Sequence, residues 1–397
     1  MNVLVLNPGS SSIKFSIFDV ARTAEEPRLL VDGELSGLGE PEAALTISRK
    51  NKRQQTLKVR GAETQAGAIS LVLDAVAQAK DVTVNAVGYR VVHPGPHIND
   101  HTFITAETLR ELERTAEFAP LHNPETILLI RETMTRMPDV PHIACFDTIF
   151  HETMPEEASI YGIPKEFRAR GVKRYGFHGL SCESAIRQLS AAGSLPKRLV
   201  IAHLGSGCSV TAVLHGRSID TSMGLTPTGG VLMGTRPGDL DPGLLLYLLR
   251  QEPFRDAANK LEQMLNHQAG MVALSGLAND MKAVRRAAED GDNAAVLALK
   301  VFTRSVTKAI GGFAWLMGGL DAIVFTGGIG EHDAATRREI LDGTEVRIDS
   351  ALNGFAGTGV RRISASHSTT AVFAVTAQED LVIALHVKHM VWPSHID

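Results

Sequence analysis

Several charged side chains of this chain lie in or next to apolar segments, where charged residues are unusual. Arg90 lies inside the apolar run "GYRVVH", where a guanidinium must be paired or functional, and a buried ion pair is the simpler alternative. Asp147 and His151 follow another apolar run in "FDTIFH". A carboxylate at a strand end is a common metal or catalytic position, and is about as often a helix N-cap.

Two further residues stand next to irregular segments. Arg236 belongs to "MGTRPGDLDPG", a Gly-, Pro- and Asp-rich stretch that is either an exposed loop or an active-site wall. His178 belongs to "RYGFHGLS" and precedes an expected helix for which Ser181 is a candidate N-cap. A single histidine is usually structural, but its place at a chain reversal favours a functional role.

Three Gly-rich segments follow apolar runs: NPGSSS (7–12), HLGSGCS (203–209) and TGGIGE (326–331). Backbone N–H groups of such turns can point together at a phosphate. One such turn is more often a plain hairpin loop, but three of them favour a polyphosphate ligand. The signatures of P-loop NTPases, dinucleotide-binding folds, serine hydrolases and zinc proteases are missing from the sequence.

The elements that must position these residues follow a repeated order. Each half of the chain opens with an apolar strand, a Gly/Ser turn and a second apolar strand, which indicates a duplication with a boundary near 147–150. The expected strands cover 2–7, 13–19, 28–35, 43–48, 55–59, 86–92, 140–146, three segments within 198–220, 322–326 and 371–376. The expected helices cover 64–80, 105–118, 123–136, 240–251, 256–267, 277–289, 293–317 and 378–390.

Composition limits the class of protein. A chain of 397 residues with 44% hydrophobic residues predicts a globular enzyme of two or three domains. A net charge of -4 argues against nucleic acid as a partner. No secretory signal and no run of about 18 apolar residues is visible, so we expect no membrane span. Three widely spaced cysteines predict a reducing, cytoplasmic location and exclude a disulfide framework or a thiolate zinc site.

Taken together, these segments resemble the acetate kinases, within the acetokinase family that includes propionate and butyrate kinases. The opening "VLVLNPGSSSIKF" and the later "RYGFHGLSCESA" are similar to two signatures of that family. Further blocks match in order: "RVVHPG", "APLHNP", "CFDTIFH", "IAHLGSGCS", "MGLTPTGGVLMGTRPGDLDPG", "VFTGGIGE" and "TAQEDLVIA". The match runs from one end of the chain to the other.

The resemblance implies an α/β fold with two duplicated domains of the sugar kinase, heat-shock ATPase and actin type. Each domain is expected to have a mostly parallel sheet, with an active-site cleft between the domains. Residues 1–149, completed by a C-terminal helix at 380–397, would form one domain, and residues 150–379 would form the nucleotide-binding domain. In that arrangement NPGSSS and HLGSGCS are corresponding phosphate-facing hairpins.

The resemblance also implies a reaction, the reversible direct transfer of a phosphoryl group between ATP and acetate, giving acetyl phosphate and ADP. Mg²⁺ is the implied metal, with Mn²⁺ as a substitute; a homodimer is the implied assembly. The implied catalytic residues are Arg90, Asp147, His178 and Arg236, and the implied metal-binding residues are Asn7 and Glu379. Acetate would contact Arg90, Val92, Leu121, His122, Asn123, Phe177 and Pro227. ATP would contact Ser10, Ser12, Lys14, His203, Gly205, Ser206, Gly207, Asp280, Lys282, Gly327, Gly328, Ile329, Gly330 and Glu331.

The chain departs from the family pattern at four of its positions. Ser206 replaces an asparagine, which removes an amide donor toward the phosphates, so Ser206→Asn is expected to tighten ATP binding. Lys282 replaces an arginine that could stack on the purine ring, and lysine stacks less well. Gly229 stands where an acidic residue is common, and His332 stands where asparagine follows the glycine-rich block.

Two alternative functions remain open at this stage. The chain could phosphorylate propionate or butyrate, although Val92, expected on the same strand face as Arg90, favours the smaller acetate. It could also be a non-catalytic member of the fold, an ATP-binding sensor or a filament protein. The presence of Arg90, Asp147, His178, Arg236 and Glu379 argues against that second alternative.

Overall fold

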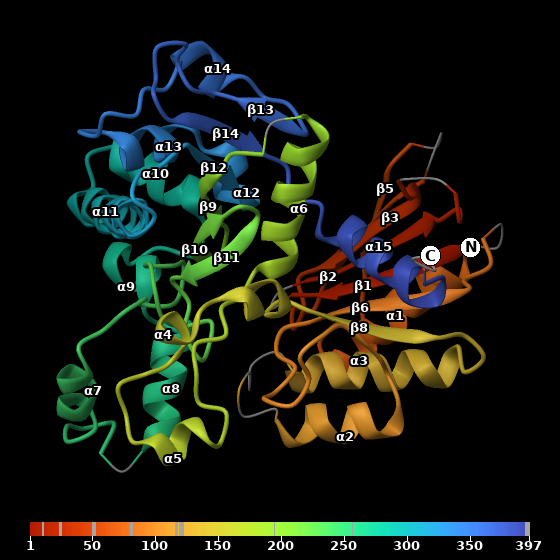
Figure 1. The fold of residues 1–397 in the computed structure, drawn as a ribbon. Coiled ribbons are helices and arrows are strands. Elements are labelled where there is room, and N and C mark those ends of the chain that lie inside the picture. The colour runs from red at the N-terminus through yellow and green to blue at the C-terminus, as the bar shows by residue number, and fades with distance from the viewer. Residues whose placement is uncertain are drawn as a thin grey trace. The chain divides into compact units, whose positions relative to one another are not determined.

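The computed structural model divides the chain into two compact units (Figure 1). Unit 1 contains Met1–Ile149 and Gln378–Asp397, and unit 2 contains Phe150–Ala377. The residues that the structure describes are 1–9, 12–23, 26–49, 53–79, 82–115, 118, 123–193, 195–255 and 257–393. Within these ranges no helix is both long and apolar enough to cross a bilayer.

Unit 1 is built on one mixed sheet with the strand order β5-β4-β3-β2-β1-β6-β8-β7. Strands β1 to β5 form an antiparallel meander, β6 and β8 continue it in parallel with β1, and β7 pairs antiparallel with β8. The strands are β1 (Asn2–Pro8), β2 (Ser12–Asp19), β3 (Arg28–Ser36), β4 (Ala43–Arg49), β5 (Gln55–Val59), β6 (Ala86–Val91), β7 (Thr102–Phe103) and β8 (His142–Phe146).

The expectation of a mostly parallel sheet is therefore wrong. The connections along β1 to β5 are short, and a short turn can join only antiparallel neighbours, whereas a parallel pair needs a long crossover. The segments between β1 and β6, and between β6 and β8, are long enough to provide that crossover. The short strand β7 was not predicted.

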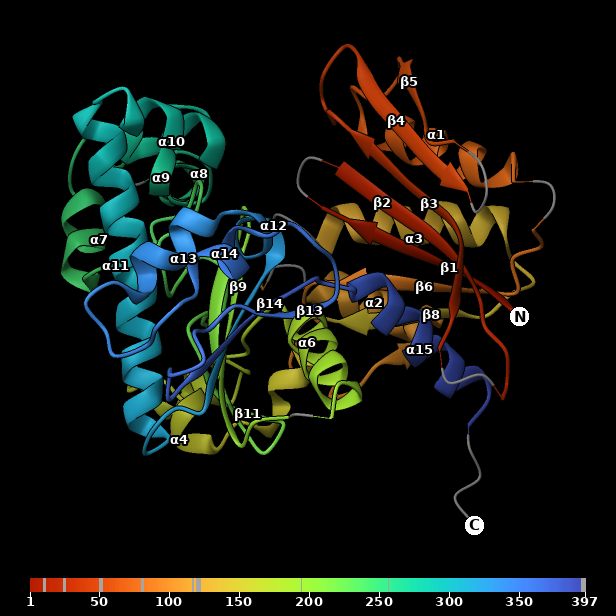
Figure 2. The ribbon, with the colours of Figure 1, turned by 90° about the horizontal axis from the view of Figure 1, so that it is seen from above.

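Helices cover both faces of the unit 1 sheet (Figures 1 and 2). Leu4 and Leu6 of β1 belong to the core formed with α1 (Gln65–Ala77) and α3 (Asn123–Arg136), and α2 (Ala106–Arg114) lies next to α3. On β6, a Cβ at Gly88 would lie 2.6 Å from Cγ2 of Ile383 in α15 (Glu379–Val391). The C-terminal helix therefore packs directly on the backbone of the sheet, where a side chain would not fit.

Unit 2 repeats this topology with the strand order β11-β10-β9-β12-β14-β13. Three antiparallel strands are followed by two parallel ones and a short antiparallel edge strand, which matches β3-β2-β1-β6-β8-β7 of unit 1. The strands are β9 (Arg198–Leu204), β10 (Cys208–Leu214), β11 (Arg217–Thr221), β12 (Ala322–Thr326), β13 (Val360–Arg362) and β14 (Ala371–Val375). The predicted α/β class with two related halves is confirmed.

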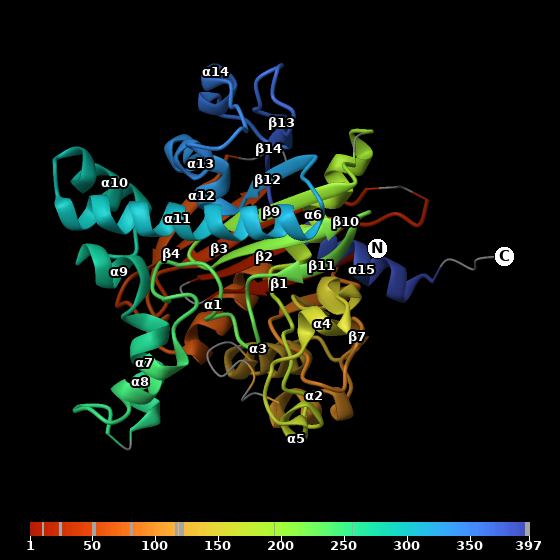
Figure 3. The same cartoon turned by 60° about the vertical axis from the view of Figure 1, so that its left-hand side comes forward.

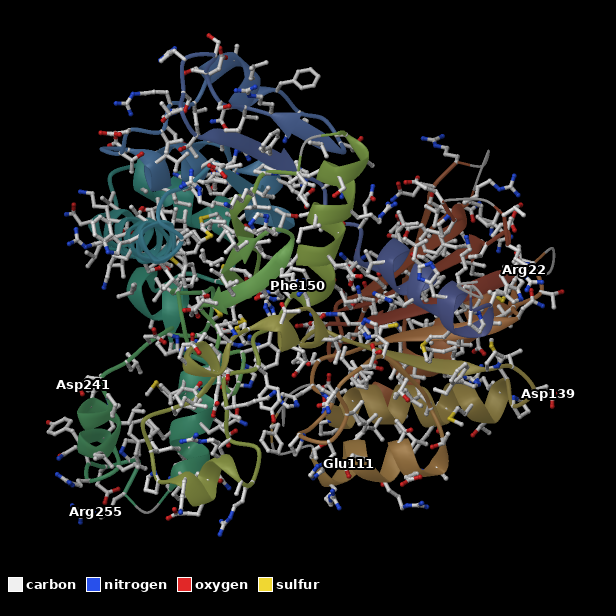
Figure 4. All side chains as sticks on the ribbon, in the orientation of Figure 1. Arg22, Glu111, Asp139, Phe150, Asp241 and Arg255 are labelled. Carbon is white, nitrogen blue, oxygen red and sulfur yellow. The ribbon has the colours of Figure 1, made fainter. Side chains whose placement is uncertain are left out.

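The longest helix of unit 2 is α11 (Asn293–Leu316), which runs beside β9 and β10 (Figure 3). Asp292 begins it by accepting hydrogen bonds from the N–H groups of Ala294 and Ala295. Asp241, labelled in Figure 4, caps α7 in the same way. The other helices are η2 (Ile149–Thr153, a 3₁₀ turn), α4 (Glu156–Ser159), α5 (Lys165–Arg168), α6 (Gly179–Ala191), α7 (Pro242–Leu248), α8 (Ala258–His267), α9 (Gly270–Ser275), α10 (Met281–Glu289), α12 (Gly327–His332), α13 (Ala334–Leu341) and α14 (Ser350–Gly354).

Two predicted local features differ in the structure. Helix α6 begins at Gly179 and its N-cap is His178, in the left-handed region with φ 60, so Ser181 is not the cap. The TGGIGE segment is not a turn, because Gly327–His332 forms helix α12 directly after β12. Arg337, which is 1% exposed, stabilises that helix by donating a hydrogen bond of 2.8 Å to the carbonyl oxygen of Gly330.

Candidate active site

In unit 1 the tertiary structure pairs Arg90 with Asp147. Arg90 lies on β6 opposite Cys145 of β8, so Asp147 follows two residues later at the carboxyl end of the neighbouring parallel strand. The Arg90 Nη2–Asp147 Oδ2 distance is 2.5 Å, and Nε lies 3.1 and 3.0 Å from the two carboxylate oxygens. Burial lowers the pKa of Arg90, but the charges of Asp147 and Glu379 outweigh it and raise that pKa above its ordinary value. Arg90 therefore remains protonated.

Asn7, at the end of β1, joins this pair to the start of α15. Its Nδ2 donates to Asp380 Oδ1 at 2.9 Å and reaches Glu379 Oε2 at 3.5 Å, while its Oδ1 accepts from Arg90 Nη1 at 3.4 Å. Glu379 Oε2 also lies 3.9 Å from Arg90 Nε. The structure thus brings together four residues singled out in the sequence: Asn7, Arg90, Asp147 and Glu379.

Asp380 is a member of this cluster that sequence reasoning missed. It accepts hydrogen bonds from Asn7 and from Ser16 Oγ, the latter at 2.7 Å. Burial raises the pKa of Asp380, and the neighbouring Glu379 raises it further. The available signal was the pair of adjacent acidic residues at the start of the "EDLVIA" helix.

The cluster gathers the carboxyl groups of Asp147, Glu379 and Asp380 near the guanidinium of Arg90. A bound cation would compensate the negative charge of these carboxyl groups. The donor atoms are carboxylate and amide oxygens, the ligands that Mg²⁺ and Mn²⁺ prefer. The residues present therefore fit a divalent metal ion of this type.

In unit 2 the structure stacks His178 on His203, with the ring centroids 4.1 Å apart. Nδ1 of His178 lies 3.0 Å from Ser209 Oγ, and Nδ1 of His203 lies 2.8 Å from Ser181 Oγ. Because the Nδ1 atoms have these partners, the Nε2 atoms are directed elsewhere.

The Nε2 atoms of both histidines face Gly-rich backbone. A Cβ at Gly207 would lie 3.3 Å from His178 Nε2 and 3.8 Å from Nη1 of Arg236. A Cβ at Gly327 would lie 3.1 Å from His203 Nε2. A ring nitrogen and a guanidinium thus face the bare backbone of one loop, and such groups can bind an anion.

His151, the other histidine singled out in the sequence, supports His178. Its Nε2 donates to the carbonyl oxygen of Phe177 at 3.0 Å, and its Nδ1 lies 2.9 Å from Ser218 Oγ. Burial lowers the pKa of His151 to about 4, so its ring is neutral. Its role is to hold the backbone that precedes His178.

A cavity of about 630 Å³ lies in unit 2 beside the Gly205–Gly207 loop. Six predicted nucleotide residues line it, namely Gly205, Ser206, Asp280, Lys282, Gly328 and Ile329. Residues that sequence reasoning missed also line it, among them Gly234, Asn279, Arg285, Phe302 and Asp333. Arg285 is held there by Asp333, at 2.6 Å from its Nε, and by Glu339, at 2.8 Å from its Nη1. His332, a departure from the family pattern, belongs to the same lining.

The chain matches the acetokinase family over residues 2–385. This chain belongs to the acetokinase family. It is 37% identical to the acetate kinase of Geobacillus kaustophilus, over 98% of each chain. It is 38% identical to the propionate kinase of Citrobacter rodentium, over 98% of this chain and 96% of that one.

Solved structures agree with this family assignment. The acetate kinase of Porphyromonas gingivalis superposes with a TM-score of 0.84 at 32% identity, covering 98% of this chain and 99% of that chain. A propionate kinase from Francisella tularensis superposes with a TM-score of 0.87 at 32% identity and the same coverage. The predicted family and the predicted fold class are both confirmed.

Several family-implied residues have mainly structural contacts in this acetokinase. Glu331 Oε1 accepts a hydrogen bond from the N–H of Ala377 at 3.0 Å, and Gly330 accepts one from Arg337. Asn123 begins α3 and donates to the carbonyl oxygen of His93 at 2.9 Å. The lining of the 630 Å³ cavity does not include five described residues from the predicted nucleotide set of unit 2: His203, Gly207, Gly327, Gly330 and Glu331. Ser10, Leu121 and His122 lie outside the described residues.

The implied acyl pocket needs one correction. Strand β6 ends at Val91, so Val92 lies beyond it and strand alternation does not place its side chain on the face of Arg90. Val92 is nevertheless buried, at 6% exposed, as is Phe177 at 1%. The carbonyl oxygen of Pro227 accepts a hydrogen bond from Nη1 of Arg236 at 3.1 Å. Of the remaining phosphate-facing residues, Ser12 and Lys14 open β2, where Lys14 pairs with Asn7 in the strand register.

Proposed function

We propose that this acetokinase is an acetate kinase, which transfers a phosphoryl group directly and reversibly between ATP and acetate. The products in one direction are acetyl phosphate and ADP. The observation that carries the proposal is the convergence of His178 Nε2 and Arg236 Nη1 on the backbone of Gly207, beside a cavity large enough for a nucleotide. Phosphoryl transfer makes few covalent demands on the protein and depends on such positioned donors and cations.

In unit 2 the residues act on the moving phosphoryl group. His178 Nδ1 lies 3.0 Å from Ser209 Oγ, and we assign Nε2 of the ring to donate a hydrogen bond to an equatorial oxygen. Arg236, whose backbone-anchored Nη1 lies beside the same glycine, supplies positive charge to these oxygens. The backbone can approach the phosphates closely at Gly205, at Gly207 and at the start of α12.

In unit 1 Arg90 binds an anion through Nη1, the guanidinium nitrogen that does not contact Asp147. Asp147 occupies Nε and Nη2, and among the residues that the structure describes the remaining Nη1 has only the long 3.4 Å contact to Asn7. Asp147 therefore orients Arg90. We assign to Arg90 the binding of the acetate carboxylate and of the phosphoryl group that this carboxylate receives. Val92, Phe177 and Pro227 are assigned to the apolar surroundings of the methyl group.

The divalent ion belongs with the carboxylates of unit 1. Asn7 and Glu379 would hold Mg²⁺, partly through water, with Mn²⁺ as a substitute of similar ligand preference. When bound, the ion neutralises charge on the phosphates of ATP. Asp380 orients Asn7 for this purpose, and it does so through the 2.9 Å hydrogen bond from Asn7 Nδ2.

The test is formation of acyl phosphate by the purified protein, trapped as a hydroxamate, with MgATP and acetate, propionate or butyrate. We expect acetate to give the highest kcat/KM, propionate a lower one and butyrate a much lower one, since each added methylene overlaps the pocket wall. A preference for propionate, as the names of some relatives imply for those proteins, would assign the chain to the second candidate. Absence of any acyl phosphate would leave a nucleotide-binding protein without catalysis.

We also propose that the protein is a cytoplasmic homodimer. Exposed apolar side chains on α7 and α11 support an interface on unit 2: Leu246, Tyr247, Leu297, Val301 and Trp315, of which Trp315 is 90% exposed. Light scattering coupled to gel filtration would give the mass, and a mass of one chain would contradict the dimer.

A further inference from the structure

The amide group of Asn279 lies against the Ser206 loop. Asn279 Nδ2 donates to Ser206 Oγ at 3.0 Å, although the two residues are 73 positions apart in the sequence. Both residues line the 630 Å³ cavity of unit 2. Asn279 immediately precedes Asp280, the N-cap of α10, so its backbone is anchored by the start of that helix.

Asn279 is exposed, and its carboxamide rests against the backbone of Gly234. A Cβ at Gly234 would lie 2.0 Å from Asn279 Oδ1 and 3.0 Å from its Nδ2, so the carboxamide lies directly on the bare Cα of Gly234. Gly234 is itself fixed, because its N–H donates to the carbonyl oxygen of Ser206 at 3.2 Å. Ser206, Gly234 and Asn279 form one interlocked corner of the cavity.

We propose that Asn279 is a phosphate-binding residue of the nucleotide site, and that its amide takes the place of the one that Ser206 lacks. The inference rests on the proposed function. A carboxamide nitrogen carries two hydrogens, and the bond to Ser206 uses one. Because Ser206 Oγ accepts that bond, its own O–H is available as a donor. The corner thus offers two donors, one from each residue, to an anion in the cavity.

The position within the cavity distinguishes phosphate from nucleobase. Ser206 is next to Gly207, whose backbone faces His178 Nε2 and Arg236 Nη1. Lys282 and Arg285 line the cavity from α10, three and six residues after Asn279 in the sequence. The Asn279 amide therefore belongs to the end of the cavity that holds the phosphates, and the charged side chains of α10 belong to the nucleoside end.

The first experiment compares wild type with Asn279→Ser by titration calorimetry. ADP and ATP should bind about tenfold more weakly to the variant, the effect of losing one hydrogen bond to a charged group. Adenosine should bind both proteins equally. Asn259→Ser, on the exposed face of α8, is the matched control and should change none of these affinities. Equal ADP affinity in wild type and Asn279→Ser, or an equal loss for adenosine, would overturn the proposal.

The second experiment exchanges the two side chains. Ser206→Asn alone should leave ADP affinity within about twofold of wild type, because the amide of Asn279 already occupies that position. This differs from the expectation from sequence that Ser206→Asn tightens nucleotide binding. Ser206→Asn combined with Asn279→Ser should restore the affinity that Asn279→Ser loses. A double variant as weak as Asn279→Ser would overturn the proposal even if thermal melting shows all proteins folded.

These outcomes distinguish failure of the role proposed for Asn279 from failure of the proposed nucleotide site. A wild-type protein that makes acetyl phosphate while Asn279→Ser binds ADP normally would overturn only the role of Asn279. A wild-type protein that binds neither ADP nor ATP would overturn the nucleotide site, and the role of Asn279 with it.

Discussion

Arg90 shows how an ion pair and a functional group can be the same residue. In the pair with Asp147 the guanidinium uses Nε and Nη2, so the third nitrogen is directed toward Asn7 at a distance longer than a normal hydrogen bond. Each guanidinium nitrogen of a purely structural arginine is expected to have a hydrogen-bond acceptor. Arg337 is an example, since its three nitrogens donate short hydrogen bonds to Asn353 and Gly330. This difference supports the proposal that Arg90 binds a further anion.

Removal of either active-site arginine should act on turnover. Arg90→Ala and Arg236→Ala should each lower kcat by about 10²-fold or more, because an arginine aimed at a transferring phosphoryl group contributes about 10³–10⁵. Arg198→Ala, which breaks a half-buried pair with Asp321 at the start of β9, is the control and should leave kcat unchanged. Near-normal turnover in the first two variants, with a lowered melting temperature, would make both arginines structural.

The acyl pocket gives a prediction about specificity. Val92→Ala removes two methyl groups from a buried position and should raise kcat/KM for propionate relative to acetate. Discrimination against one methylene is worth about 1–3 kcal/mol, so the ratio should shift by about tenfold to a hundredfold. Steady-state kinetics with both acids measures it. A fixed ratio would remove Val92 from the pocket.

At the scale of elements, His151 joins three parts of unit 2. It lies in η2, its Nδ1 contacts Ser218 of β11, and its Nε2 holds the Phe177 carbonyl just before α6. That backbone turns at His178 with φ 60, a conformation that residues other than glycine rarely adopt. The buried imidazole thus helps to maintain a strained residue at the start of α6.

Stability should depend on pH through His151. Its pKa is lowered by burial from 6.5 to about 4, so between these pH values the unfolded chain binds more protons than the folded one. The stabilisation is full above about pH 6.5 and is lost as the pH falls toward 4, by up to about 3 kcal/mol. Melting temperatures at pH 7.5 and 5.0 should differ more in wild type than in His151→Gln. Equal differences would contradict this assignment.

At the scale of the whole molecule, the chain begins and ends in unit 1. Helix α15 packs on β6 at Gly88, and its first two residues complete the cluster around Asn7. Unit 2 is one continuous segment between the two parts of unit 1. The folding of unit 1 therefore depends on residues that follow unit 2 in the sequence.

Overpacking at Gly88 tests this dependence without replacing any residue of the charged cluster. In Gly88→Val the new Cβ meets Ile383 and Val387 at 2.6 and 2.7 Å, so α15 must move. We expect a loss of about 1–3 kcal/mol of stability, together with faster hydrogen exchange in 379–391. Gly291→Val, at a positive φ in unit 2, is a strained control that should leave exchange in α15 unchanged. Unchanged exchange in Gly88→Val would contradict the packing argument.

The sequence by itself determined the local elements and the family. Apolar runs, Gly/Ser turns and helix caps such as Asp292 depend on residues a few positions apart, and the ordered blocks from "NPGSSS" to "TAQEDLVIA" pointed to the acetokinases. Only the tertiary structure decided which of these residues meet. Arg90 and Asp147 are 57 positions apart, Ser206 and Asn279 are 73 apart, and Asp380 joins Asn7 from the opposite end of the chain. Such contacts follow from strand order and from glycines that permit close approach, and neither leaves a periodic signal in the sequence.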